Sequence, residues 1–198
     1  MILNIVKYGH PILRKKGAPI DKITPEIQRL AADMLEAMHH AKGVGLAAQQ
    51  VGRAIQLAVF DVRGIKDRPS SIEIDGQPAE VDRLMPMVLV NPAFKPIAPP
   101  VEGLEGCLSF PEIYNEVSRP ESIEVEALNE KGERLEFHCS GLLARAIQHE
   151  ADHLNGILFI DRMSAEKKNE IRAELEVLQA NTKAELKTTQ SRKDPERV

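Results

Sequence analysis

The stretch Gln148-His149-Glu150-Ala151-Asp152-His153 contains the pattern H-E-x-x-H, and the rest of the chain is best interpreted around it. Two histidines four positions apart lie on one face of a helix, so both imidazoles can bind one metal ion. Glu150 can point toward the same centre without binding the metal. That position suits a general base acting on metal-bound water, whereas a purely structural metal site has no use for it.

The helix that carries this motif is expected to run from about residue 142 to residue 154 and to end at Asn155-Gly156. Its apolar side chains occur on most sides, which is typical of a helix inside a domain. Apolar or alternating segments predict strands at residues 55–62, 87–90, 123–127 and 134–138, the last two joined as a hairpin. We therefore predict an α+β fold with antiparallel sheets around a central helix carrying the metal motif.

The remaining segments predict further elements around these sheets and the motif helix. We expect a strand at residues 1–6, a helix at 25–42 capped by Thr24 and stopped by Gly43, and a long surface loop with room for a short hairpin at 64–83. A charged helix with an apolar stripe at Ile171, Leu175 and Leu178 is expected at 164–187, before a disordered tail at 188–198. Residues 1–164 are thus the expected catalytic part, and residues 165–198 a helix and tail of the same domain without a separate core.

Length and composition indicate an ordinary globular protein. The chain has 198 residues, of which 42% are hydrophobic and 28% charged, enough for one domain with a hydrophobic core. The formal net charge of -4 argues against nonspecific DNA binding. Two cysteines cannot form a disulfide framework, and neither a signal peptide nor an apolar run of about 18 residues occurs. These features predict a cytoplasmic protein that does not enter a membrane.

Two histidines leave a catalytic metal short of one protein ligand. Glu170 and Glu174 lie downstream, where zinc proteases with this motif place a third ligand, but both belong to the charged helix, whose glutamates are expected to face solvent. Cys107 is the better candidate, because the glycine-rich segment before it, ending at Gly106, lets the backbone approach a metal or substrate closely. A closed structural site would add Cys139 to Cys107 and the two histidines, but it leaves Glu150 without a role.

Three segments resemble one family. Residues 43–50 (GVGLAAQQ) resemble a G-x-G-x-A-A-x-Q motif, residues 105–109 (EGCLS) an E-G-C-L-S motif, and residues 148–153 (QHEADH) a Q-H-E-x-D-H motif, in the order and spacing of the peptide deformylases. The flanking residues 8–14 and 158–162 are similar to that family too. The resemblance therefore covers residues 5–164, most of the chain.

The resemblance implies a chemistry for each motif. Members of the family remove the formyl group from the N-terminal formylmethionine of nascent peptides. Cys107, His149 and His153 would hold one divalent metal, Fe2+ in the natural state, with Zn2+, Ni2+ or Co2+ as substitutes. Glu150 would move the proton, and the Gln50 amide and the Leu108 backbone N–H would stabilise the oxyanion.

The resemblance also implies where the substrate lies. Gly45 and Gly106 would approach the peptide backbone, which adds as a strand, and Val44, Leu142, Ala146 and the His149 ring would line the methionine pocket. We assign Arg145, on the same helix, no role from sequence. The charged helix at 164–187 could contact the ribosome near the nascent chain, or could simply be solvated.

One position departs from the family pattern. Gln49 stands where the family usually has a proline, so two adjacent glutamines compete for the motif role and the loop is expected to be looser. Register favours Gln50. Two alternatives remain at the level of sequence: a zinc endopeptidase using Glu170 or Glu174, and a noncatalytic binding module stabilised by zinc. The sequence does not predict an oligomeric state.

Overall fold

The computed structural model describes residues 2–193 and contains both α-helices and β-strands. The helices are α1 (Pro25–His40), α2 (Gly141–Leu154), α3 (Ala165–Glu170) and α4 (Arg172–Lys193). The strands are β1 (Gly45–Ala47), β2 (Leu57–Phe60), β3 (Ser70–Ile74), β4 (Gln77–Ala79), β5 (Met87–Pro96), β6 (Pro100–Cys107), β7 (Phe110–Pro120), β8 (Ser122–Leu128) and β9 (Arg134–Ser140). Short 3-10 turns cover Pro11–Arg14, Ala48–Val51, Val81–Leu84 and Phe159–Asp161.

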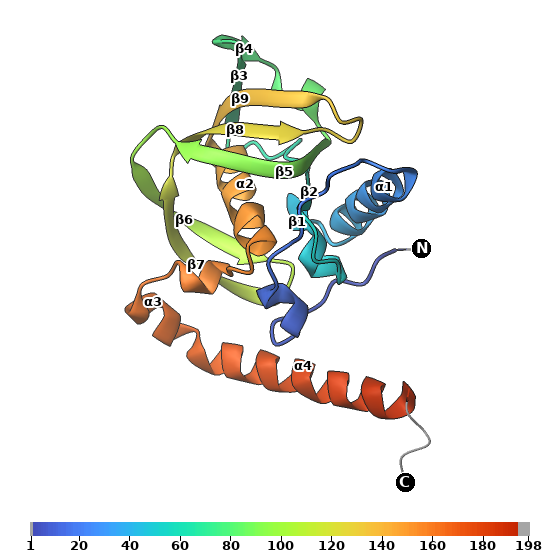
Figure 1. The fold of residues 1–198 in the computed structure, drawn as a ribbon. Coiled ribbons are helices and arrows are strands. Elements are labelled where there is room, and N and C mark those ends of the chain that lie inside the picture. The colour runs from blue at the N-terminus through green and yellow to red at the C-terminus, as the bar shows by residue number, and fades with distance from the viewer. Residues whose placement is uncertain (1, 194–198) are drawn as a thin grey trace.

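Two antiparallel sheets form the body of the protein (Figure 1). The larger sheet has seven strands in the order β1-β2-β5-β8-β9-β3-β4, and the smaller sheet is the β6–β7 hairpin. α2 contacts strands of both sheets, and Figure 1 shows it running beneath the large sheet beside this hairpin. The predicted mixed fold with antiparallel sheets is confirmed.

α2 is buried along nearly its whole length, which follows from its composition. Every residue from Leu142 to Leu154 is buried, and the helix ends at Leu154, before Gly156 with a φ of 73°. Gly141, with a φ of 68°, begins the helix where a Cβ would lie 2.1 Å from the Pro69 carbonyl oxygen. The sheet-to-helix connection is therefore tight, and it places the metal motif in the second half of the helix.

Three sequence-based expectations need correction. Residues 2–6 form no strand; instead the backbone N–H of Val6 donates to the Gln50 carbonyl at 2.8 Å. The region 64–83 contains the expected short hairpin, formed by β3 and β4, but this hairpin belongs to the large sheet through β9 and is not a separate surface loop. β5 continues past Asn91 to Pro96, since a register shift between Val90 and Ala93 absorbs the interruption.

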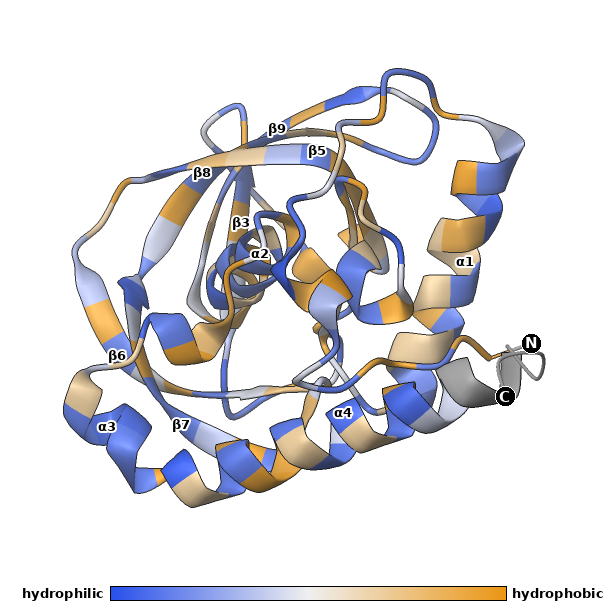
Figure 2. Cartoon of the chain, turned by 60° about the horizontal axis from the view of Figure 1, so that its bottom comes forward, coloured by the Kyte–Doolittle hydropathy of each residue, from blue (hydrophilic) through white to orange (hydrophobic). Residues whose placement is uncertain are grey.

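The C-terminal region is more helical than expected. Two helices meet at Ile171, and α4 reaches Lys193, so the predicted disorder is wrong for residues 188–193, while residues 194–198 lie outside the described part of the chain. The predicted stripe packs into a cluster with Leu13, Phe110 and Phe159. Figure 2 shows apolar residues recurring among the hydrophilic ones along α4. Among the residues described, no helix has both the length and the apolar character needed to span a membrane.

Candidate metal centre

Cys107, His149 and His153 meet between β6 and α2. One ligand atom from each lies within 4.8 Å of the other two, and the Cys107 Sγ is 3.2 Å from His153 Nε2. Two histidines come from one face of α2, as the four-residue spacing requires. Within residues 2–193, no other group of three such side chains is brought together.

The other proposed ligands lie elsewhere. Cys139 is 2% exposed in the core, paired with Ile72 and Ile123 on the neighbouring strands. Burial raises its pKa to about 12, so it is a neutral thiol. Glu170 and Glu174 are exposed, and neither belongs to the cluster. The four-ligand site with Cys139 and the endopeptidase ligand set are therefore wrong.

Glu150 faces the cluster from the same helix. It is 4% exposed, and its Oε2 has no hydrogen-bond partner among the described residues. Burial raises the pKa of this carboxyl to about 7, although the charges of His149 and Arg119 act in the opposite direction. A buried carboxyl with an unpaired oxygen and a pKa near neutrality is suited to accept and return a proton.

The two adjacent glutamines point in opposite directions. Gln50 accepts from the Ala47 N–H through Oε1 at 2.8 Å, which orients its amide. Its Nε2 then points to the Cys107 Sγ at 3.5 Å and to the Ser109 hydroxyl at 3.3 Å. The amide donor that faces the cluster therefore belongs to Gln50, as the motif register predicts.

Gln49 is fully buried and fastens the loop on the other side. Its Nε2 donates to the carbonyl of Leu154, the last residue of α2, at 3.1 Å and to that of Lys15 at 3.4 Å. A proline could make neither contact. Side-chain hydrogen bonds at this position thus hold the loop against α2, which argues against the expected loosening.

A buried charge network supports His149. Its Nδ1 lies 2.9 Å from Glu105 Oε2, so the ring can donate to this carboxylate and keep Nε2 free for a metal. Glu105 also accepts from Arg119 at 2.7 Å and from Arg145 at 2.9 Å. Burial alone would raise the pKa of Glu105, but the hydrogen bonds from His149 and Arg119 outweigh it and lower the pKa to about 2.

The same network extends to Asp152 in α2. Arg119 donates to Asp152 at 2.8 Å, and Arg162 donates to the other Asp152 oxygen at 2.6 Å. Asp152 immediately precedes His153 in α2. No role was predicted for Glu105 and Asp152 from sequence. The available signal was their place within one or two residues of predicted ligands, on a glycine-rich strand and a buried helix.

Arg145 is explained by the hairpin. Besides Glu105, it donates to the Val117 carbonyl at 2.8 Å and to the Val101 carbonyl at 2.9 Å. A Cβ at Gly103 would lie 2.8 Å from its guanidinium. Arg145 therefore joins α2 to both strands of the β6–β7 hairpin, and this hairpin carries Cys107.

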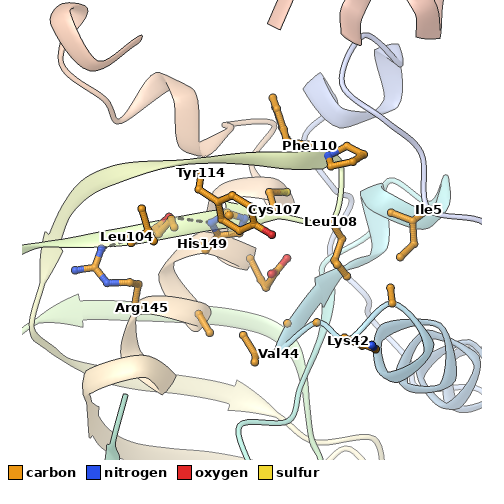
Figure 3. Close-up of a pocket in the computed structure, with 18 of the residues that line it drawn as sticks. Ile5, Lys42, Val44, Leu104, Cys107, Leu108, Phe110, Tyr114, Arg145 and His149 are labelled. Carbon is orange, nitrogen blue, oxygen red and sulfur yellow. Dashed lines mark hydrogen bonds and ion pairs between the residues drawn. The ribbon is translucent and has the colours of Figure 1, made fainter. Parts of the chain in front are cut away.

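The cluster opens into a cavity of about 520 Å3. All five predicted substrate-binding residues line this cavity: Val44, Gly45, Gly106, Leu142 and Ala146. Leu108 also borders it. Figure 3 shows Tyr114 beside Cys107 and His149, with Val44 across the cavity. The exposed apolar side chains of Leu104 and Tyr114, which were not predicted from sequence, extend this lining to the surface.

The sequence profile of the polypeptide deformylase family matches residues 2–169. The chain belongs to this family. It is 50% identical over 176 residues to the peptide deformylase of Methylacidiphilum infernorum, covering 89% of this chain and 92% of the relative. Identity to the Opitutus terrae peptide deformylase is 45% over 189 residues, covering 94% and 98%. The crystal structure of Arabidopsis thaliana peptide deformylase 1B superimposes with a TM-score of 0.79 at 40% identity, covering 92% of this chain and 93% of that one.

Deformylases are metal-dependent hydrolases, and the residues present here fit a metal. A thiolate and two imidazoles are ligands that divalent transition metals accept, and three protein ligands leave a position open. The buried, unpaired Glu150 oxygen faces the same space. The donor set therefore fits a catalytic metal rather than a closed structural one.

Replacing Glu105 by glutamine is expected to weaken metal binding about tenfold to a hundredfold, because a ligand histidine loses the carboxylate that orients it. A chelator competition titration measures this. Glu102→Gln is the control, since Glu102 lies on the same hairpin but pairs only with Lys167 at the surface. Equal metal affinities for wild type and Glu105→Gln would contradict the orienting role.

Gly45→Ala is expected to lower kcat about tenfold to a hundredfold with little loss of stability. A Cβ at this position would lie 2.7 Å from Glu150 Oε1, so the carboxylate at the end of a flexible side chain must move. Small displacements of a catalytic group are costly for the rate. Kinetics, metal content and thermal unfolding are measured together; an unchanged kcat would mean that Glu150 tolerates displacement.

Proposed function

We propose that this protein removes the N-formyl group from the formylmethionine that begins newly synthesised polypeptides, and releases formate. The observation that carries the proposal is the cluster of Cys107 with the buried His149 and His153, beside which one oxygen of the Glu150 carboxyl is unpaired. Cys107, His149 and Glu150 line the 520 Å3 cavity. Membership of the deformylase family supports the same reaction. We place the protein in the cytoplasm, where nascent chains are made.

Cys107, His149 and His153 would hold one divalent metal. When bound, the metal supplies a Lewis acid for the formyl carbonyl and lowers the pKa of a water molecule. We propose Fe2+ as the natural ion, with Zn2+, Ni2+ or Co2+ as substitutes. A thiolate ligand with ferrous iron is prone to oxidation, so we expect activity to be lost in air.

Glu150 moves the proton. Its carboxylate accepts a proton as water attacks the formyl carbon, and the resulting acid gives that proton to the departing amine. The pKa of about 7 makes both directions accessible near neutral pH. Because Gly45 leaves room for the carboxyl, the side chain can serve both steps without backbone movement.

Gln50 and Leu108 stabilise the oxyanion that forms on the formyl oxygen. Gln50 Nε2 already points to the cluster, and its orientation is set by the Ala47 N–H. Leu108 follows Cys107 directly, so its backbone N–H lies at the same end of the hairpin. Donors of this kind act strongly because they are in place before the charge develops.

β1 provides the docking edge for the peptide. It is the terminal strand of the seven-stranded sheet and pairs on one side with β2. An extended peptide can add to such an edge through its backbone hydrogen bonds. Gly45 of β1 lines the cavity, so the added peptide would lie in it. We assign the methionine side chain to the apolar part of the cavity formed by Val44, Leu142 and Ala146. From the charged character of α4, we also propose that this helix contacts the ribosome near the nascent chain.

The test compares products from matched peptides. Metal-loaded protein prepared without oxygen is incubated with formyl-Met-Ala-Ser and with longer peptides that lack the formyl group. Mass spectrometry should show loss of the formyl group from the first peptide and no internal cleavage of the others. Internal cleavage of unformylated peptides, with the formyl group left in place, would replace this proposal by a protease function.

A further inference from the structure

The segment Val6–Tyr8 joins the two loops that carry the proposed oxyanion donors. The Val6 N–H donates to the Gln50 carbonyl at 2.8 Å. The next two residues bond to the other loop. Lys7 Nζ donates to the Leu108 carbonyl at 2.9 Å, and the Tyr8 N–H donates to the Ser109 carbonyl at 2.9 Å. Three consecutive residues therefore connect Gln50 to the backbone at Leu108.

Lys7 is the side-chain member of this connection. It is partly buried and lines the same cavity as Cys107. Figure 3 shows Ile5, which directly precedes this segment, at the Leu108 end of that cavity. Burial lowers the pKa of Lys7, and the nearby Cys107 sulfur offsets part of this effect. A half-buried ammonium is costly without a partner, and here the Leu108 carbonyl is the acceptor.

The Leu108 backbone lies where the β6–β7 hairpin turns. It forms the short connection between β6 and β7, and the register of the hairpin shifts between Gly106 and Cys107. A register shift interrupts the hydrogen-bond ladder locally, so the peptide groups beside it need other partners. The Lys7 ammonium fixes one face of this connection, directly after the N–H that would donate to the oxyanion.

We propose that Lys7 is a positioning residue that holds the Leu108 backbone at a fixed place relative to Gln50. This inference rests on the deformylase function proposed above. Lys7 acts through Leu108 and does not touch the substrate. Its removal therefore affects the rate of the chemical step more than the binding of the peptide.

The test uses two substitutions at Lys7. Lys7→Met keeps the apolar stem and removes the donor, and kcat is expected to fall roughly tenfold to a hundredfold with KM within about twofold of wild type. Lys7→Arg keeps a charged donor within reach of the carbonyl and is expected to recover most of kcat. Lys16→Met, at an exposed lysine that does not line the cavity, controls for the lost charge.

A second readout does not depend on activity. Amide hydrogen exchange at Leu108 and Ser109 is expected to be faster in Lys7→Met than in wild type or Lys16→Met, with metal content and thermal unfolding unchanged. An unchanged exchange rate and kcat in Lys7→Met would overturn the inference, and so would a rise in KM alone, which would make Lys7 a substrate-binding residue. Failure of wild type to release formate would instead count against the proposed function, and the exchange measurement would still decide the role of Lys7.

Discussion

Replacing Glu150 by alanine is expected to reduce kcat for formate release by about 10²–10⁴-fold, the usual contribution of a positioned general acid–base group. The carboxyl is buried beside the cluster, with one oxygen unpaired among the described residues. Glu105 cannot replace it, since its carboxylate is engaged by His149, Arg119 and Arg145. Glu150 is not one of the three predicted ligands, so the variant should still bind metal.

The comparison is made at equal metal content. Glu150→Gln serves as a second variant, because it keeps the size of the side chain and removes its ability to accept the proton. Both variants should bind a formylated peptide with nearly the wild-type affinity. Full activity in a metal-loaded Glu150→Ala protein would show that another group moves the proton.

Replacing Cys107 by alanine is expected to weaken metal binding by more than about a hundredfold and to abolish formate release with it. Substitutions of groups that merely orient a ligand already cost about tenfold to a hundredfold, and Cys107 is itself a predicted ligand. The loss should be visible as metal content after dialysis and as a change in the absorption of the Co2+-substituted protein, because the thiolate-to-metal charge transfer disappears.

Cys139→Ala is the matched control. This second cysteine is buried in the large sheet, away from the cluster, so its substitution should affect the free energy of unfolding without changing metal affinity. Retention of metal and activity in Cys107→Ala would contradict the three-ligand site. That result would mean that the metal is held by ligands other than this cysteine.

Local patterns were sufficient for much of the fold and for the residues of the cluster. The four-residue spacing of His149 and His153 predicts their shared face directly, and the glycines before Cys107 indicate a backbone that can approach a metal. Strands β8 and β9 follow from simple alternation, and their observed bounds extend the predicted ones by a few residues.

The parts that were missed depend on contacts between distant segments. The β6–β7 hairpin contains three prolines and two glycines within its strands, and these residues disfavour a strand prediction from sequence. It is held to α2 by Arg145, through contacts that no local pattern reveals. The link from Glu105 through Arg119 to Asp152 likewise joins three elements. Residues 2–6 have a strand-like pattern but no partner strand, so their backbone bonds go elsewhere.

Formate release by the metal-loaded wild-type protein is the most direct test of the account. Protein purified without oxygen and loaded with Fe2+ is given formyl-Met-Ala-Ser, then treated with a chelator and reloaded. The account predicts one formate for each new amino terminus, loss of the activity on chelation, and its return with Fe2+. A folded protein that binds the metal at Cys107, His149 and His153 but releases no formate would contradict it.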